Sequence, residues 1–168
     1  DFCIDPSKIE EKITKKTKLI IPVDLYGQVY KYTQVKEIAE KHDIKILEDA
    51  CQAIGAQQDG VTAGNFGNLA AFSLYATKNI ATGEGGMLTT NDDEIARRAK
   101  MYRHHGQDEA VRYEYLDLGH NYRLTDIAAA IGVEQMKKIE RIINTRNENA
   151  KNLTEGLSKI KGIVVPKV

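Results

Sequence analysis

Short β-rich runs alternate with longer helical patterns along this chain of 168 residues. Residues 19–25, 44–47, 69–74 and 87–90 are predicted to form strands, because they are short, mostly apolar runs bounded by turn residues. Helical spacing of apolar side chains follows most of these runs. Such alternation is typical of α/β proteins, in which helices cover a sheet of parallel strands. We therefore expect one α/β unit with a core of its own.

The helix boundaries are predicted from capping residues. Thr33 is expected to cap a helix that ends near 41–43, and Asn91 or Asp92 a helix that passes through 95–102. A third helix should begin at Thr125 or Asp126 and run to Ile139, and a further amphipathic stretch covers 142–160. The stretch 57–68, with three glycines, is expected to form a hairpin or loop, and 162–168 is expected to begin another strand.

Two ionisable residues are placed at the ends of predicted strands. Asp49 ends the strand that begins at Ile44, and Lys78 lies in the Gly-rich loop that follows the next strand. An amine and a carboxylate at the ends of neighbouring strands can hold opposite sides of one ring. Pyridoxal phosphate needs such a pair, a lysine for a Schiff base with its aldehyde and an acid that keeps its ring nitrogen protonated. Glu48 alternates with Asp49 to the other face of the strand and is expected to be structural.

Five segments carry a wider resemblance. They are IIPVDLYGQ (20–28), EDACQAIGA (48–56), FSLYATKN (72–79), GEGGM (83–87) and GHNYRL (119–124). In order and spacing they resemble the DegT/DnrJ/EryC1/StrS family of pyridoxal-phosphate-dependent sugar aminotransferases, across nearly the whole chain. The resemblance implies the three-layer α/β/α large domain of fold-type I enzymes, incomplete at both ends. Residues 1–133 would form part of that cofactor-binding domain, and 134–168 a connecting helix and first strand towards a C-terminal domain.

The resemblance also implies roles for individual residues. Lys78 would bind the cofactor and act as catalytic base, and Asp49 would pair with the ring nitrogen. Gln52 would contact the ring or its 3′-oxygen, and Ser73 the phosphate. Asn121 would reach the phosphate of a neighbouring subunit, so a homodimer with shared active sites is expected. Arg123 would line the substrate entrance or form a structural salt bridge, two readings of equal weight.

The implied reaction transfers an amino group from an amino acid, expected to be L-glutamate, to a nucleotide-linked keto sugar. A sugar 3-dehydratase is the nearest alternative, but such relatives carry histidine at the position of Lys78. A non-catalytic regulator stays open. A nicotinamide-dependent oxidoreductase is disfavoured, because no Gly-x-Gly-x-x-Gly fingerprint is present. Departures from the family pattern are Asp24, Cys51 and Ile54, which touch the surroundings of the cofactor.

Composition excludes several other classes. The 24 basic and 24 acidic side chains balance, so net charge gives no support to nucleic-acid or membrane binding. No apolar run approaches the ~20 residues of a membrane helix, and a cytoplasmic protein is expected. The two cysteines and four histidines show no metal-ligand spacing, so no metal site is expected. Cys3 and Cys51 are expected to be small buried hydrophobes.

Overall fold

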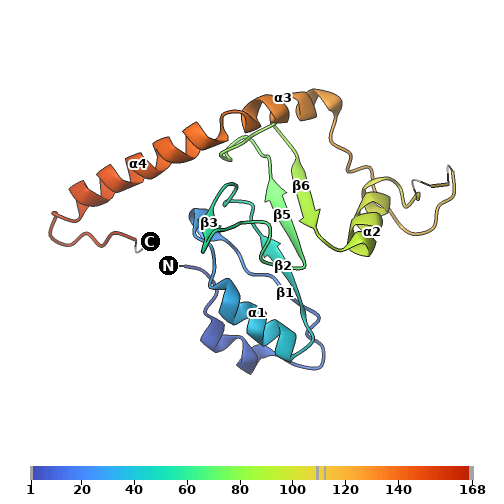
Figure 1. The fold of residues 1–168 in the computed structure, drawn as a ribbon, viewed down its shortest axis with the longest axis horizontal. Helices are drawn as coiled ribbons and strands as arrows, with labels where there is room; N and C mark the ends of the chain where they lie inside the picture. The colour runs from blue at the N-terminus through green and yellow to red at the C-terminus, as the bar shows by residue number, and fades with distance from the viewer. Residues whose placement is uncertain (1, 109, 112, 167–168) are drawn as a thin grey trace.

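A four-stranded mixed sheet forms the centre of the computed structural model, which describes residues 2–108, 110–111 and 113–166 (Figure 1). Its strands, in spatial order, are β1 (Leu19–Ile20), β2 (Lys45–Asp49), β5 (Leu69–Ser73) and β6 (Gly86–Thr90). The pairs β1–β2 and β2–β5 are parallel, whereas β6 runs antiparallel to β5. Between β2 and β5 a short hairpin pairs β3 (Gln57–Gln58) with β4 (Val61–Thr62). The sheet is therefore mostly parallel, as predicted, with an antiparallel edge.

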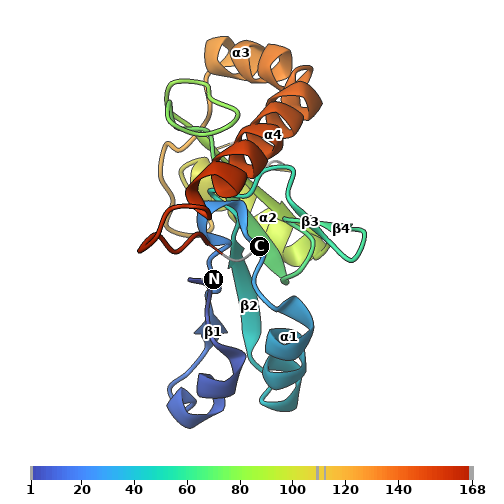
Figure 2. The same cartoon turned by 90° about the vertical axis from the view of Figure 1, so that its left-hand side faces the viewer.

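Four α-helices accompany the sheet: α1 (Tyr32–Lys41), α2 (Asp93–Arg103), α3 (Asp126–Met136) and α4 (Ile139–Leu157). Short 3₁₀ turns cover Pro6–Lys8 (η1), Glu10–Lys12 (η2) and Leu25–Gly27 (η3). Helix α1 packs against β2, and α2 packs against β6. Figures 1 and 2 both show α3 and α4 lying beyond the strand ends at which β2 and β5 finish.

The core lies between α1, β2 and the loop before β5. Val35 and Ala39 of α1 and Ile46 of β2 are buried there. Tyr30 and Phe66 close it with an edge-to-face ring contact at 6.2 Å. Burial alternates along β2, so Ile46 and Glu48 face the interior while the side chain of Asp49 is half-buried on the other face. This alternation confirms the opposite orientations expected for Glu48 and Asp49.

Two predicted caps are confirmed. The side chain of Asp92 accepts hydrogen bonds from the backbone N–H groups of Glu94 and Ile95 at the start of α2. The hydroxyl of Thr125 accepts one from Ala128 at the start of α3. These bonds satisfy N–H groups that have no partner inside the helix.

Several predicted boundaries are wrong. The strand expected over 19–25 ends at Ile20, because Pro22 has no N–H with which to continue the ladder. Thr33 does not cap α1, which already begins at Tyr32. The helix expected to reach Ile139 stops at Met136, where Lys138 donates to the Gln135 carbonyl and tightens the last turn.

The end of the chain also differs from expectation. Residues 162–166, the described part of the predicted last strand, form no strand here, since a strand needs a hydrogen-bonded neighbour. Residues 167–168 lie outside the described part. Among the helices that the structure describes, none is long and apolar enough to span a bilayer.

Candidate functional site

Lys78 lies in a loop, residues 74–85, whose two ends are pinned together. The Leu74 N–H donates to the Gly85 carbonyl at 2.9 Å, and the Thr82 N–H donates to the Leu74 carbonyl at 2.8 Å. Ile80 is fully buried and anchors the middle of the loop. The Lys78 N–H itself donates to the Tyr75 carbonyl at 2.9 Å and closes a turn. The loop thus holds the lysine backbone in place and leaves its side chain half-buried.

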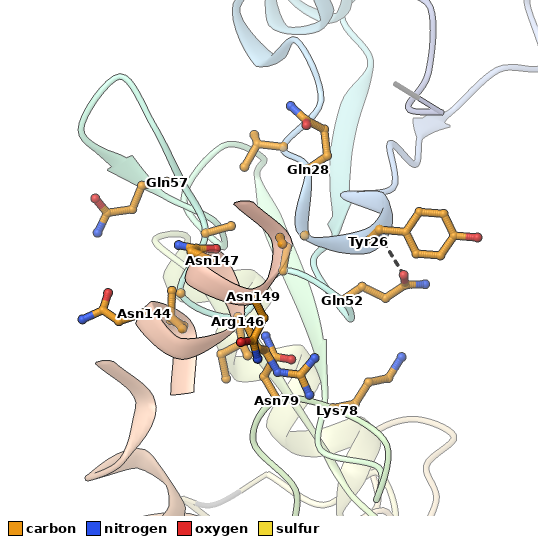
Figure 3. A pocket seen from close by; sticks show the side chains of 18 of the residues that line it. Tyr26, Gln28, Gln52, Gln57, Lys78, Asn79, Asn144, Arg146, Asn147 and Asn149 are labelled. Carbon is orange, nitrogen blue, oxygen red and sulfur yellow. Dashed lines mark hydrogen bonds between the residues drawn. The ribbon is translucent and has the colours of Figure 1, made fainter. Parts of the chain in front are cut away.

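A broad cleft of about 1490 Å³ opens beside this loop. Its walls come from η3, from the segment after β2, from residues 77–79 and from α4. Figure 3 shows Lys78 and Gln52 on one side of it, Asn144 and Asn147 of α4 on the other side, and Arg146 between them. Its polar lining consists mostly of amides, together with the cations Lys78 and Arg146 and one acid, Glu140, and apolar residues make up much of the rest. The amides and the two cations suit a polar, anionic ligand.

Cys51 links the two ends of the candidate site. Its N–H donates to Asp49 Oδ1 at 3.1 Å, and its thiol lies 3.6 Å from the Ala71 carbonyl. Burial and the neighbouring Asp49 raise the pKa of the thiol to about 11, against a lowering by the Lys78 ammonium. The pKa of the Cys51 thiol therefore depends on both the Asp49 carboxylate and the Lys78 ammonium. Lys78 and Asp49 lie at the same end of the sheet, as the strand order predicts, although only Lys78 is among the residues that line the cleft.

Gln52 is held by a turn on the neighbouring strand. Its side-chain oxygen accepts a hydrogen bond of 3.0 Å from the Tyr26 N–H (Figure 3). Tyr26 adopts a left-handed backbone, with φ 58°, which is uncommon for a residue with a Cβ. No helix follows Asp49 before Gln52. The turn, and not a helix, brings this amide to the cleft.

Glu48 has the structural role expected of it. The side chain is fully buried, and its carboxylate oxygens accept hydrogen bonds from the Gly64 and Phe66 N–H groups. These bonds fix the loop before β5 against β2.

The other candidate residues lie outside this cleft. Ser73 ends β5, and its hydroxyl accepts a bond from the Tyr75 N–H at 3.3 Å. Asn121 and Arg123 are exposed on the segment after α2, where Arg123 Nε donates to Asn121 Oδ1 at 3.0 Å. A second Arg123 nitrogen lies 3.2 Å from Nδ1 of His104. Arg123 borders a different depression, beside Thr82 and Gly85.

Sequence reasoning missed two features of the cleft. It assigned no role to Tyr26, whose N–H holds Gln52, and it treated α4 only as an amphipathic helix. The sequence does carry one signal for the first, a Tyr-Gly pair directly after the predicted strand over 19–25.

Comparisons with known proteins identify the family and the fold. A family model described as the DegT/DnrJ/EryC1/StrS aminotransferase family matches residues 1–168. GDP-perosamine synthase of Caulobacter vibrioides is 42% identical over 145 residues, which are 86% of this chain and 39% of that protein. The chain spans less than half of the length of the first curated relatives that it matches.

Solved structures share the fold. Helicobacter pylori PseC, an aminotransferase involved in the biosynthesis of pseudoaminic acid, matches with a TM-score of 0.90 and 32% identity over 95% of this chain and 43% of that one. An Escherichia coli GDP-4-keto-6-deoxy-D-mannose-3-dehydratase with bound hydrated PLP matches with a TM-score of 0.89 and 30% identity, over 98% of this chain and 47% of that one. The expected fold class is confirmed by these neighbours.

Proposed function

The chain belongs to the DegT/DnrJ/EryC1/StrS aminotransferase family, and from this premise we propose that it carries the lysine-bearing half of a pyridoxal-phosphate-dependent site that aminates nucleotide-linked keto sugars. L-Glutamate is the proposed amino donor. The observation that carries the proposal is Lys78, held on a pinned loop beside an amide-lined cleft and at the same sheet end as Asp49.

The residues present fit the cofactor by their chemistry. The donor set combines a primary amine, a carboxylate, an amide and a hydroxyl, at Lys78, Asp49, Gln52 and Ser73. Lys78 would hold the aldehyde carbon, Asp49 the ring nitrogen, Gln52 the ring or its 3′-oxygen, and Ser73 the phosphate. When bound, the cofactor supplies a carbonyl that accepts the amino group and a cationic ring that withdraws electrons.

The protein's own contributions follow from these positions. Lys78 Nζ, in its neutral form, accepts the proton from the α-carbon of the amino donor and returns it on the sugar side. Asp49, as a carboxylate, stabilises a positive charge opposite the lysine. The cationic and amide groups of the cleft orient an anionic substrate.

The direct test uses the full-length protein loaded with pyridoxal phosphate. We expect an absorbance band near the visible that borohydride removes, and expect Lys78→Ala to lack it. Lys15→Ala, which removes an exposed lysine far along the sequence, is the matched control and should keep the band. A borohydride-sensitive band that persists in Lys78→Ala would refute the role of Lys78.

The substrate class is tested by screening nucleotide-linked keto sugars with glutamate and following 2-oxoglutarate. Amination of one of them would support the transferase. A protein that keeps an intact cofactor complex but aminates none of them would favour the regulator, and loss of a sugar hydroxyl without amination would indicate the dehydratase.

A homodimer with shared active sites is part of the proposal, because Asn121 is exposed and away from the Lys78 cleft. Mixing inactive Lys78→Ala with inactive Asn121→Ala should restore activity, since half of randomly mixed dimers would contain one intact site, giving about a quarter of the wild-type rate. A mixture that stays inactive although hybrid dimers form would contradict shared sites. The reaction is proposed to be cytoplasmic, since nucleotide sugars and glutamate are charged and do not cross bilayers unaided.

A further inference from the structure

Three oxygen-bearing side chains lie fully buried directly behind the strand end that carries Asp49. They are Asp24, Glu48 and Tyr30, each with no exposed surface. Burial of two carboxyl groups side by side is costly if both are ionised, because neither desolvation nor mutual repulsion is compensated. Something must therefore distinguish their protonation states.

The hydrogen bonds make that distinction. Glu48 accepts two backbone N–H bonds, one on each oxygen, so both of its oxygens already have a donor. Asp24 accepts only one, on Oδ1 from the Tyr30 N–H at 3.1 Å. Asp24 Oδ2 and the Tyr30 hydroxyl are buried without a partner. Asp24 Oδ2 is thus the oxygen with room for a proton.

The neighbouring charges act in the same direction. Burial raises the pKa of Asp24 to about 7, opposed by the Tyr30 N–H and reinforced by Glu48 and Asp49. Burial, Glu48 and Asp24 together raise the pKa of the Tyr30 hydroxyl. The titratable groups that act on Asp24 are thus Glu48 and Asp49 of β2, and the Tyr30 hydroxyl of the segment before α1 lies in the same field.

We propose that Asp24 is a neutral carboxylic acid that shares the proton on Oδ2 with Glu48, and that this pair is a positioning unit for the cofactor side of the cleft. Asp24 begins the turn that holds Gln52. Its N–H donates to the Asp49 carbonyl at 3.0 Å, and the Asp49 N–H donates to the Pro22 carbonyl at 2.9 Å. The same turn presents the Tyr26 N–H to Gln52. The statement that Gln52 and Asp49 contact a cofactor rests on the proposed function. The proton on Asp24 does not.

The proton itself is tested by comparing full-length wild type with Asp24→Asn. The folded pKa of Asp24 lies above its ordinary value, so its stabilising contribution is complete below about pH 4 and is lost as the pH rises towards 7. The wild-type unfolding constant should rise relative to that of Asp24→Asn by up to about tenfold per pH unit in this window. Asp59→Asn removes an exposed acid of the β3–β4 turn and should keep the wild-type slope.

Infrared spectroscopy gives an independent readout. A protonated-carboxyl band should be present at pH 6, absent in Asp24→Asn and unchanged in Asp59→Asn. Equal pH slopes in wild type and Asp24→Asn, or a band that survives Asp24→Asn, would overturn the shared proton.

The positioning role is tested by titrating pyridoxal phosphate into the apoproteins. Asn still donates a hydrogen bond to Glu48, so Asp24→Asn should bind within about twofold of wild type, whereas Asp24→Leu should bind about tenfold more weakly. Equal affinity of Asp24→Leu and wild type would overturn the role. If Asp24→Leu does not fold, Asp24→Asn alone tests the role. An Asp24→Asn affinity far below wild type would then overturn it, because Asn keeps the hydrogen bond to Glu48. A wild type that binds no cofactor would refute the proposed function and leave the pH and infrared tests intact.

Discussion

The thiol of Cys51 reports on both charges of the candidate site, because Asp49 raises its pKa and Lys78 lowers it. With a pKa of about 11, the thiol should be almost entirely neutral at pH 8 and should carry a thiolate fraction some hundreds of times below that of an ordinary cysteine. Asp49→Asn should lower the apparent pKa of alkylation, and Lys78→Gln should raise it. Mass spectrometry of the Cys51 peptide across a pH series measures both.

The pH series separates charge from access, since a more open site changes the limiting rate but not the midpoint. Midpoints that move together in both variants would contradict the placement of Cys51 between the two groups. Glu48→Gln is a useful comparison, because Glu48 faces the interior and should leave the midpoint nearly unchanged.

Single residues were easier to predict from the sequence where the backbone is regular. Glu48 and Asp49 lie within a strand, where alternation fixes opposite faces, and both orientations were predictable. Asp24 and Gln52 lie in irregular segments, so neither the burial of the first nor the contact of the second with Tyr26 could be derived from spacing. The contact of Gln52 is made by Tyr26, whose left-handed backbone no periodicity reveals.

The loop over 74–85 is the element on which the candidate site depends most. Gly85 has φ 146°, and a Cβ there would lie 2.8 Å from Leu124 Cδ1 and 3.0 Å from Thr82 Oγ1. Gly85→Ala should therefore destabilise the protein by about 1–3 kcal/mol and weaken the Leu74–Gly85 bond that closes the loop. Gly60→Ala is the control, because φ is 79° but no atom lies within 4 Å of the added Cβ.

Urea unfolding of the full-length variants measures the loss in the free energy of unfolding for Gly85→Ala and for Gly60→Ala. We expect Gly60→Ala to lose about 1 kcal/mol from its backbone conformation alone. A Gly85→Ala variant as stable as Gly60→Ala would mean that the close approach at the base of the loop is unimportant.

Helix starts that are marked by a capping side chain were predicted correctly. Element ends that depend on one backbone hydrogen bond were not. Asp92 and Thr125 have short polar side chains before helical patterns, and both caps were found. The early end of β1 follows from the missing N–H of Pro22, and the break at Lys138 follows from one i to i+3 bond. The antiparallel direction of β6 depends on how the 74–85 loop returns, which strand composition does not encode.

Across the whole molecule, the sheet and the last two helices differ in how they are held. Residues of α1, β2 and β5 contribute to the buried core, whereas α3 and α4 contain no buried residue in the described chain. Helix α4 touches the body through Ile139 and Ile143 near Gly55. The domain boundary expected after residue 133 stays a prediction. The difference in burial between the sheet and α4 provides a way to test it.

Hydrogen exchange of the 168-residue chain should reveal that difference. Most helical stability in proteins comes from packing an apolar face against a neighbour, and α4 has no buried residue. Amides of α4 should therefore exchange orders of magnitude faster than those of β2 and β5, whose backbone groups pair inside the sheet. Ile143→Ala should speed exchange in α4 further and leave β2 unchanged, with Ile163→Ala as the matched control outside the helix. Protection of α4 equal to that of β2 would show that helix and sheet open as one cooperative unit, and would place no boundary between them.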